Sequence, residues 1–349
     1  MLPLRTETIL KSIVGRYIVN AVPVPSQSIM HDYGLRVSSA TIRNEMARLE
    51  HDGYIIRPHT SAGSVPSDMG YRYYVESLQD IELPLNQQHQ IEHTFHQVET
   101  RLEEWLSLTA TLLAHLVNNT AVVFIPRPAS CQFKHLEVVS LQDNTALLVM
   151  VLHGARVRQQ LVAFEQPVSQ PELTVISAKL NAACAGLTAQ QISAGEATMS
   201  DIERQLTDCV LSIMQTEDEE GRDEPYIDGL HFTLDQPEFA GGRQMLPLVE
   251  LVEQRNRLRT ILPRQLSSHG VQVVIGKENE TESIRNYSVV LSRYGLPDEA
   301  VGTIAIIGPT RMPYARTIAA IDYLAWLLNR LIARLYGKET PNQRDHSES

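Results

Sequence analysis

The sequence predicts an α+β protein with an N-terminal winged helix-turn-helix, followed by an α+β domain that carries a further domain inserted in it. Three observations predict this fold class. The chain has 349 residues, which is enough for about two to three domains. Residues 1–75 combine three helical patterns with a strand, a turn and a second strand. Further along the chain, two groups of strand patterns lie on either side of a helical block.

The composition excludes several classes of protein. With 43% hydrophobic and 20% charged residues, the chain is typical of a globular protein rather than of a disordered or fibrous one. The longest apolar stretch, residues 112–125, is interrupted by histidine and asparagine, so we expect no transmembrane helix. The N-terminus has no apolar signal core, and we expect the protein to stay in the cytoplasm. The cysteines are odd in number and lack metal-type spacing, which predicts reduced thiols. They are Cys131, Cys184 and Cys209.

The acidic balance of the chain is uneven along its length. Residues 1–75 hold eight Lys or Arg and six Asp or Glu, whereas the remainder holds 22 and 35, which gives the net charge of −11. Phosphate contacts need Lys and Arg, because these side chains displace the counterions of a nucleic acid. Any nucleic-acid function is therefore expected within residues 1–75.

The first helical pattern begins near Thr6 and ends before Pro23 and Pro25. Its apolar residues repeat with helical spacing on one face. They are Ile9, Ile13, Val14, Tyr17 and Ile18. This pattern predicts an amphipathic helix that packs against the elements that follow it.

The second and third helices are close together in the sequence. Ser26 is expected to cap a helix that runs through Tyr33 and is closed by Gly34. After a brief turn, Ser38 is the N-cap candidate of a helix that continues to about His51. Three helices with a tight turn between the second and the third are typical of a helix-turn-helix.

The third helix has an apolar face and a small, polar and basic face. At about 100° per residue, Ile42, Met46 and Leu49 lie within about 60° of one another and are expected to face the core. Small residues in the first turn let a helix approach base edges, while Arg and Asn offer bidentate contacts to guanine and adenine. With the turn that follows, the candidate DNA-binding residues are Ser38, Ser39, Ala40, Thr41, Arg43, Asn44, Arg48, His59, Thr60 and Ser61.

The segment behind the third helix predicts a wing. Residues 54–56 predict a strand, residues 59–63 a turn and residues 65–66 a short edge strand, because Pro66 limits pairing. A helix resumes at residues 71–74. Many small domains of three helices do not touch DNA, and periodicity alone leaves that alternative open. The wing favours the DNA-binding interpretation.

Residues 85–117 predict a long amphipathic helix, or two, that links the first domain to the rest of the chain. Strand patterns follow at residues 121–125, 135–141, 146–152 and 157–164. We expect these strands to form one antiparallel sheet. The helical block then covers residues 171–185, 201–214 and 246–262.

The helical block is interrupted by an acidic run at residues 217–224, which predicts a solvated loop. Strands return after the block, and a final amphipathic helix spans residues 314–336. The returning strands cover residues 271–275, 288–294 and 302–307. The tail from Lys338 is expected to be disordered.

Two parts of the chain carry specific motifs. The N-terminal part has PV at 23–24, Ser26, YGL at 33–35, VSSATIRNEM at 37–46, GY at 53–54, PHTSAG at 58–63 and GYRYYV at 70–75. The C-terminal part has IGKEN at 275–279, Gly302, IIGPTRM at 306–312 and YAR at 314–316. Both sets closely resemble the signatures of the HrcA family of bacterial heat-inducible transcription repressors. The resemblance spans almost the whole chain, although the middle carries no motif as specific.

The resemblance implies a fold and a set of domain boundaries. It implies a winged helix, a GAF-like domain and a dimerisation domain inserted into the latter. The expected boundaries are 1–80 for the winged helix, 81–118 for the linking helix, 119–165 and 271–337 for the GAF-like domain, 166–270 for the inserted domain, and 338–349 for a disordered tail.

The resemblance also implies a function. It implies a homodimer that represses chaperone operons by binding an inverted-repeat operator in double-stranded DNA. The GroE chaperonin is expected to assist this repressor into its active form. Such a repressor is not an enzyme, and we expect neither a cofactor nor a metal.

Two positions depart from the family pattern. Ser64 follows the SAG run where the family usually has Arg, and Gln27 stands where it usually has Lys or Arg. Two phosphate contacts are therefore expected to be missing, and the affinity or the operator sequence is expected to differ.

Two other motifs suggest alternative functions. His89, Glu92 and His93 fit the H-x-x-E-H pattern of a metal-dependent hydrolase, with His96 one turn further on. On a helix these histidines project away from the apolar face, so we interpret them as a solvated face. A catalytic zinc site would need a closed pocket with a further protein ligand and an open water position.

The second alternative is a winged-helix regulator that is switched by a small molecule in the GAF-like domain. The turn at residues 308–311 is a candidate anion-binding turn in that domain. The competing interpretation is a tight turn before the last helix, in which Arg311 has a structural role. Residues 270–277 lack the spacing and the Ser or Thr of a phosphate-binding loop, so no nucleotide site is expected.

Overall fold

The computed structural model confirms a mixed fold of helices and strands. It describes residues 2–338 apart from 31–37, 60–62, 80, 99–100, 128–130, 143, 154–155, 196–198, 221–224, 241–244, 255–257, 259–260, 264–269 and 297–299. The chain divides into two compact units. The first comprises Met1–Ile125, Glu224–Gly295 and Gly302–Ser349, and the second Pro126–Asp223 and Leu296–Val301.

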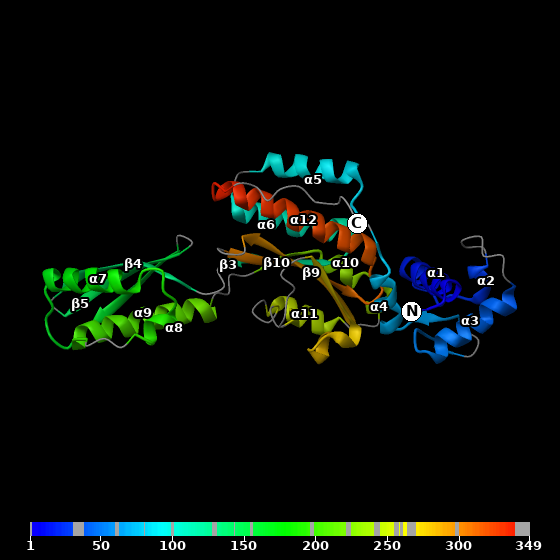
Figure 1. Cartoon of the computed structure of the whole chain (residues 1–349), viewed down its shortest axis with the longest axis horizontal. Coiled ribbons are helices and arrows are strands. Elements are labelled where there is room, and N and C mark those ends of the chain that lie inside the picture. The colour runs from blue at the N-terminus through cyan, green and yellow to red at the C-terminus, as the bar shows by residue number, and fades with distance from the viewer. Residues whose placement is uncertain are drawn as a thin grey trace. The chain divides into compact units, whose positions relative to one another are not determined.

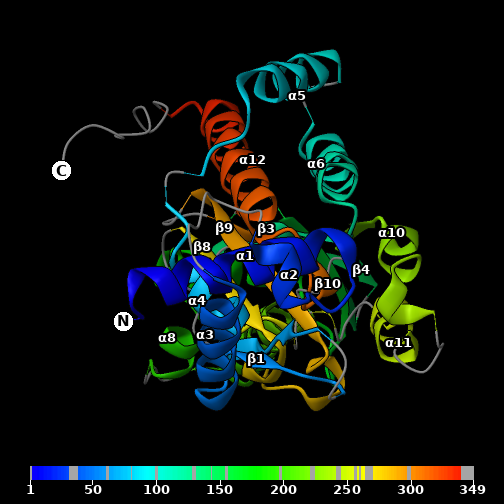
Figure 2. The ribbon, with the colours of Figure 1, turned by 90° about the vertical axis from the view of Figure 1, so that its right-hand side faces the viewer.

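The first unit begins with a small group of helices and strands, which we call the head (Figure 2). Its elements are α1 (Leu4–Asn20), α2 (Ser26–Ile29), α3 (Ser39–His51), β1 (Ile55–Ile56), β2 (Val65–Pro66) and α4 (Asp68–Glu76). Fully buried side chains from α1, α2 and α3 form its core, among them Ile9, Ile13, Ile29, Ile42 and Leu49. Most of the apolar positions that the helical spacing predicted on α1 and α3 are therefore buried, whereas Tyr17 and Ile18 are half-buried.

The second helix differs from the prediction at its start. Ser26 is its first helical residue, and Pro25 occupies the N-cap position without a side-chain hydrogen bond. The extended backbone of Pro25 leads into the helix, and the fixed φ of proline is compatible with a helix start. The predicted end of this helix at Tyr33 and Gly34 lies outside the described residues.

The linking segment consists of two helices, which is one of the two arrangements that the sequence predicted. They are α5 (Leu85–Gln97) and α6 (Leu102–Val117). The backbone becomes extended at Val98 and again at Arg101, which ends the helical hydrogen bonding between them. Each helix buries its own apolar residues, including Ile91 and Phe95 on α5 and Trp105 on α6.

The remainder of the first unit is a sheet between two layers of helices (Figure 1). The strand order is β7–β3–β10–β9–β8, with β3 at Thr120–Arg127, β7 at Tyr226–Asp228, β8 at Val271–Ile275, β9 at Tyr287–Leu296 and β10 at Ala300–Pro309. The outer pairs β3–β7 and β8–β9 are antiparallel. The strand β7 and the short helix α10 (Leu230–Leu234) were not predicted, because each is only a few residues long.

Helices cover both faces of this sheet (Figure 1). One face carries α6 and the long α12 (Tyr314–Leu335). The other carries α11 (Leu246–Glu253) and the 3-10 turn η1 (Pro237–Phe239), which share a core with buried residues of β3, β9 and β10. The 3-10 turns η3 (Gly276–Glu278) and η4 (Glu282–Ile284) connect β8 to β9. The helix α12 confirms the final helix that the sequence predicted for residues 314–336.

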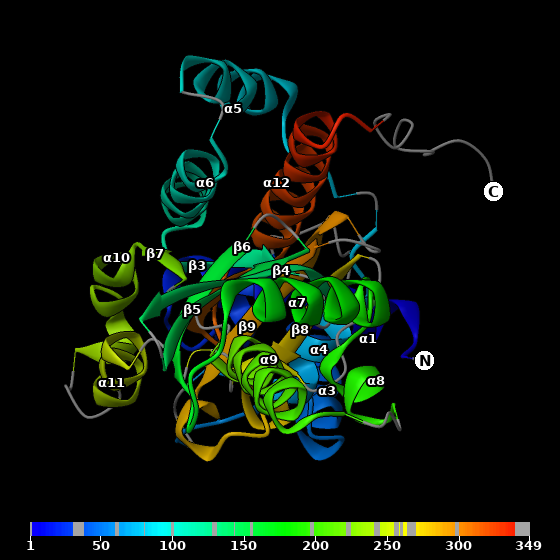
Figure 3. The ribbon, with the colours of Figure 1, turned by 90° about the vertical axis from the view of Figure 1, so that its left-hand side faces the viewer.

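The second unit has a sheet and a core of its own (Figure 3). Its strands pair antiparallel in the order β4 (Phe133–Gln142), β5 (Thr145–Leu152) and β6 (Arg156–Ala163). Its helices are α7 (Gln170–Cys184), α8 (Ala189–Ser193) and α9 (Asp201–Glu220). Alternate residues on one face of the sheet, such as Leu148 and Met150, are fully buried with Leu173 of α7 and Leu206 of α9.

The grouping of strands differs from the prediction of one sheet over residues 121–164. Strand β3 belongs to the sheet of the first unit, whereas β4, β5 and β6 pair only with one another among the described residues. The boundary between the units accordingly falls near Pro126 and not at residue 165. The physical reason is that strands 133–163 need a cover for their apolar face, and α7 and α9 provide it.

The acidic run at residues 217–224 also differs from the predicted loop. Its first part continues α9 as far as Glu220. Glu217 is 7% exposed and forms an ion pair with Arg158, and Asp218 accepts a hydrogen bond of 2.7 Å from the backbone N–H of Cys131. Residues 221–224, and the tail predicted beyond Lys338, lie outside the described residues. Of the helices that the structure describes, none combines the length and the hydropathy of a membrane span.

Candidate DNA-binding interface

The orientation of α3 follows from its apolar stripe. Ile42 and Leu49 are fully buried and Met46 is 3% exposed, all of them toward the core of the head. Because a helix buries one side and exposes the other, the candidate residues between them face solvent. Ala40, Arg43, Asn44 and Arg48 are exposed, whereas Ser39 and Thr41 are half-buried.

The hydroxyl groups at the start of α3 are used within the helix. Ser38 is the N-cap, and its Oγ accepts a hydrogen bond of 3.2 Å from the backbone N–H of Thr41. The two hydroxyl oxygens of Ser38 and Thr41 are also 2.9 Å apart and share a hydrogen bond. These side chains therefore fix the first turn of α3, as capping residues do.

The charged side chains of α3 differ in their partners. Within the described part of the chain, Arg43 makes no ion pair and Asn44 no side-chain hydrogen bond. The guanidinium of Arg48 lies 3.8 Å from the carboxylate of Asp52, and both side chains are more than one third exposed. Such a solvent-exposed ion pair holds the arginine only weakly, so both arginines are available to another molecule.

The acidic side chains beside this face are paired with other groups. Glu45 accepts a hydrogen bond of 2.8 Å from the hydroxyl of Thr6 on α1. Glu50 lies 3.2 Å from the guanidinium of Arg57, which follows β1. Sequence reasoning missed Arg57, because its pairing with a glutamate on another element leaves no periodic signal. The result is a face whose unpaired side chains are basic or neutral.

The segment after β1 is held against the helices by a close backbone contact. Val24 and Ser64 exchange two backbone hydrogen bonds of 2.8 and 2.9 Å. A Cβ atom on Gly63 would lie 2.5 Å from the carbonyl carbon of Val24, so only glycine fits at this position. His59 is exposed at the outer end of this segment. Thr60 and Ser61 lie outside the described residues.

The two departures from the family pattern differ in position. Ser64 is fully buried, and its hydroxyl has no hydrogen-bond partner among the residues that the structure describes. Gln27 is exposed on α2. The side chain at position 64 therefore cannot reach a phosphate in this structure, and only Gln27 occupies a place where a basic residue would be free to do so.

The motifs that suggest other functions have structural explanations. His89, His93 and His96 are exposed on α5, and no group of three metal-binding side chains occurs among the described residues. Arg311 is 12% exposed and bonds to Glu238, to Gln236 and to the backbone of α1. The turn at residues 308–311 therefore uses its arginine to hold the first unit together.

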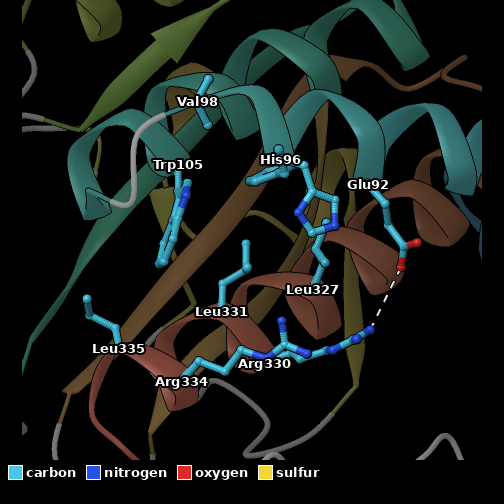
Figure 4. Close-up of a pocket in the computed structure, with 10 residues that line it drawn as sticks. Glu92, His96, Val98, Trp105, Leu327, Arg330, Leu331, Arg334 and Leu335 are labelled. Carbon is cyan, nitrogen blue, oxygen red and sulfur yellow. Dashed lines mark ion pairs between the residues drawn. The ribbon is translucent and has the colours of Figure 1, made fainter.

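A groove of about 430 Å³ lies between α5, α6 and α12 (Figure 4). Trp105, Leu327 and Leu331 form part of its apolar lining. Arg330 lies beside it, 3.9 Å from Glu92 and with its guanidinium 5.5 Å from the ring centre of Trp326. Glu92 and Arg334 line the groove as well, so its polar edge carries two arginines against one carboxylate, a charge balance suited to a small organic anion. The groove lies away from residues 308–311, the turn that the sequence suggested as a candidate anion-binding site.

Comparison with known proteins assigns the chain to a class. Residues 103–318 match the family described as the HrcA protein C-terminal domain. A protein of Dehalococcoides mccartyi named heat-inducible transcription repressor HrcA is 52% identical over 338 residues, which is 97% of this chain and 98% of that protein. A protein of the same name from Roseiflexus castenholzii is 41% identical, over 96% of each chain. These relatives are regulators of transcription and not enzymes.

The chain belongs to the HrcA family. The resemblance found in the sequence motifs is thereby confirmed. A crystal structure of a hypothetical protein at 2.2 Å resolution has the same fold, with a TM-score of 0.60 and 23% identity over 96% of this chain and 99% of that one.

The cap on α3 predicts a measurable difference between two neighbouring serines. Changing Ser38→Ala removes the hydroxyl that satisfies the first turn, and should lower the stability of α3 by about 1 kcal/mol. Changing Ser39→Ala inside the helix should alter it by no more than a few tenths of a kcal/mol. Hydrogen exchange of the α3 backbone amides measures both. Equal protection in the two variants would show that Ser38 is not a functioning cap.

Proposed function

We propose that this protein represses chaperone operons by binding an inverted-repeat DNA operator as a homodimer, and that the GroE chaperonin keeps it active. The observation that carries the proposal is the exposed face of α3, where Arg43, Asn44 and Arg48 surround small residues on a helix whose other face is buried. Family membership supports the repressor role. The direct test is footprinting on the promoter of the protein's own chaperonin operon.

The head has the arrangement that a winged helix needs for DNA. The helix α3 presents small residues at its start, so that its backbone can approach the base edges in the major groove. Arg43 and Asn44 follow within one turn and can form bidentate contacts. The strands β1 and β2, joined through the segment that contains His59, form the wing that would lie beside the groove. Because the rest of the chain is acidic, DNA contact is confined to this head.

Changing Arg43→Ala should weaken operator binding by about 1–3 kcal/mol and relax the preference at one operator position, because one bidentate contact to a base is lost. Titration of labelled operators with single base-pair changes measures both effects at a fixed salt concentration. Arg204→Ala on α9 makes the same change of net charge on an exposed arginine of the second unit. If the two variants bind alike, α3 does not read the operator through Arg43.

The second unit supports the dimer by a sheet face that no described residue covers. Val139 of β4, Leu147 of β5 and Leu161 of β6 are paired across the sheet on the side opposite α7 and α9. Val139 is 41% exposed and Leu161 is 63% exposed, and Val157 on the same face is 55% exposed. Adjacent exposed apolar side chains on one face are typical of an interface between subunits.

This face gives the dimerisation role to a different part of the chain than the sequence suggested. Sequence reasoning placed dimerisation in the inserted domain at residues 166–270. The apolar faces of α7 and α9 are already buried against the sheet. The opposite face of β4–β5–β6 is therefore the better candidate, and a second copy of this chain could cover it in a symmetric, self-complementary contact.

Changing Val157→Glu should convert the dimer to a monomer, because a charge would be buried within the apolar contact. Analytical ultracentrifugation at several concentrations measures this change. Val175→Glu provides a matched control, since Val175 lies on α7 and is 68% exposed. The proposed interface is wrong if Val157→Glu sediments as the wild type does, or if both variants dissociate.

The proposed heat response depends on folding. A chain of several domains commonly folds through intermediates that expose apolar surface, and a chaperonin binds such surface. During heat stress, unfolded clients would occupy the chaperonin and leave the repressor inactive. Operator binding by heat-treated protein should therefore recover when GroE and nucleotide are added, and an excess of unfolded competitor should block the recovery. Recovery at the same rate without GroE would show that the chaperonin does not activate the repressor. The proposal that the protein binds DNA would still stand.

The groove between α5, α6 and α12 favours one other candidate function, a regulator that a small organic anion switches. Calorimetric titration with metabolites separates this function from the chaperonin mechanism. The alternative is favoured if a metabolite binds at the groove and changes operator affinity, and if GroE has no effect on the recovery of operator binding by heat-treated protein.

A further inference from the structure

The head is attached to the sheet of the first unit by a set of polar contacts. Arg72 of α4 contacts the turn η3, which follows β8. Its guanidinium forms a bidentate ion pair with the carboxylate of Glu278. The same guanidinium donates a hydrogen bond of 2.7 Å to the backbone carbonyl of Val273 in β8. Hydrogen bonding to Glu278 raises the pKa of Arg72 further. A planar guanidinium with these partners fixes both distance and direction.

A second contact joins the start of α4 to the same turn. The carboxylate of Asp68 accepts a hydrogen bond of 3.0 Å from the backbone N–H of Lys277. The preceding Gly276 has φ +52, and a Cβ there would lie 2.5 to 2.6 Å from the carboxylate of Asp68. Position 276 therefore requires glycine both for its backbone and for the approach of the head.

The third contact lies at the far end of α1. Arg311 precedes α12, and it donates a hydrogen bond of 2.5 Å to the backbone carbonyl of Ile18. This carbonyl is in the last turn of α1, where helix carbonyls lack partners within the helix. Glu238 holds the same guanidinium at 2.5 Å from the other side. Arg311 thus joins the end of α1 to η1 and to the turn before α12.

Buried aromatic side chains complete the attachment. Tyr71 of α4 is 2% exposed, and its ring centre lies 5.8 Å from that of Tyr314, which begins α12 and is fully buried. The hydroxyl of Tyr314 bonds with Ser288 of β9 and with the carbonyl of Thr310. The contact between head and sheet therefore has an apolar centre with ion pairs at both ends.

We infer that Asp68, Arg72, Gly276, Glu278 and Arg311, which we call the anchor, are positioning residues that set the direction of α3 for the operator. This inference rests on the proposed function. It also gives a role to the two C-terminal motifs, IGKEN and GPTR, which contain no residue of the DNA-binding face. The anchor touches no DNA and acts through the two ends of the head, α1 and α4.

The anchor has a consequence for how the dimer selects its operator. Fixing each head to the first unit narrows the range of separations at which the two α3 helices can meet half-sites, which lie a multiple of the ~34 Å turn of DNA apart. Two heads on loose tethers would accept many separations and gain less from the second contact. The anchor is therefore expected to determine the preferred spacing between half-sites and not the affinity for one half-site.

The test compares full-length wild type with Glu278→Gln on operators whose half-sites are separated by spacers that change one base pair at a time. Glutamine retains the shape and one oxygen that can accept the Ile275 N–H. It loses the negative charge and the second oxygen, which accepts from Nε of Arg72. The wild type should show a sharp optimum. In the variant, the ratio between the affinity for the best spacer and the affinity for the neighbouring spacers should fall roughly tenfold. One charge-assisted hydrogen bond can supply a change of this size.

Two controls separate positioning from folding. Glu203→Gln removes the charge of a comparable ion pair, to Lys179 in the second unit, and should leave the spacing optimum sharp. Gly276→Ala disturbs the anchor without any change of charge and should flatten the optimum in the same way as Glu278→Gln. Both anchor variants should bind an isolated half-site within about twofold of the wild type, because α3 itself is unaltered.

The outcomes distinguish the anchor from the proposed function. If both anchor variants keep the sharp optimum of the wild type, or if they lose half-site binding and spacing selectivity together, the inference is wrong. If the wild type binds no half-site, the proposed function fails. Hydrogen exchange then still tests the attachment itself, since α4 amides should exchange at least several-fold faster in both anchor variants than in Glu203→Gln. Equal exchange would overturn the anchor as a physical contact.

Discussion

The burial of one stripe of α3 determines most of what this protein can do. Ile42, Met46 and Leu49 must leave water, and the space that receives them is lined by α1. Their packing fixes the rotation of α3 about its axis, so Arg43 and Asn44 face outward, with no ion pair or side-chain hydrogen bond of their own within the described residues. The functional face therefore follows from core packing, and its side chains are free because the fold does not use them.

The rotation of α3 has a use only if the head itself is held in place. The ends of the head are attached through Arg72 on α4 and through the backbone carbonyl of Ile18 on α1, which accepts a hydrogen bond from Arg311. Both attachments involve backbone groups as well as side chains, which makes their geometry more specific than that of two surface charges. The core of the head sets which residues face DNA, and the anchor sets the direction in which they point.

Local patterns predicted a large part of this architecture, and long-range pairing accounts for the rest. The helical spacing of α3 and α12 was sufficient to place both, and the exposed face of α3 followed from the angle between its residues. Strand patterns at 133–163 gave the strands but not their partners, because alternation does not reveal which helix covers a sheet. Arg72 and Glu278 are separated by more than half of the chain, and neither carries a periodic signal. The role of Arg311 was only one of two interpretations until its partners on α1 and η1 were known.

The central claim is that the outward face of α3 enters the DNA groove of each half-site, and a tethered cleavage reagent tests it most directly. Ala47 is exposed near the middle of this face, so an iron chelate on Ala47→Cys, with Cys209→Ser to leave only buried native thiols, would generate radicals there. The account predicts two clusters of cleavage related by the symmetry of the inverted repeat. The same chelate on the native Cys209 of α9 should give none. Cleavage spread evenly along the operator, or equal cleavage from both positions, would contradict the account.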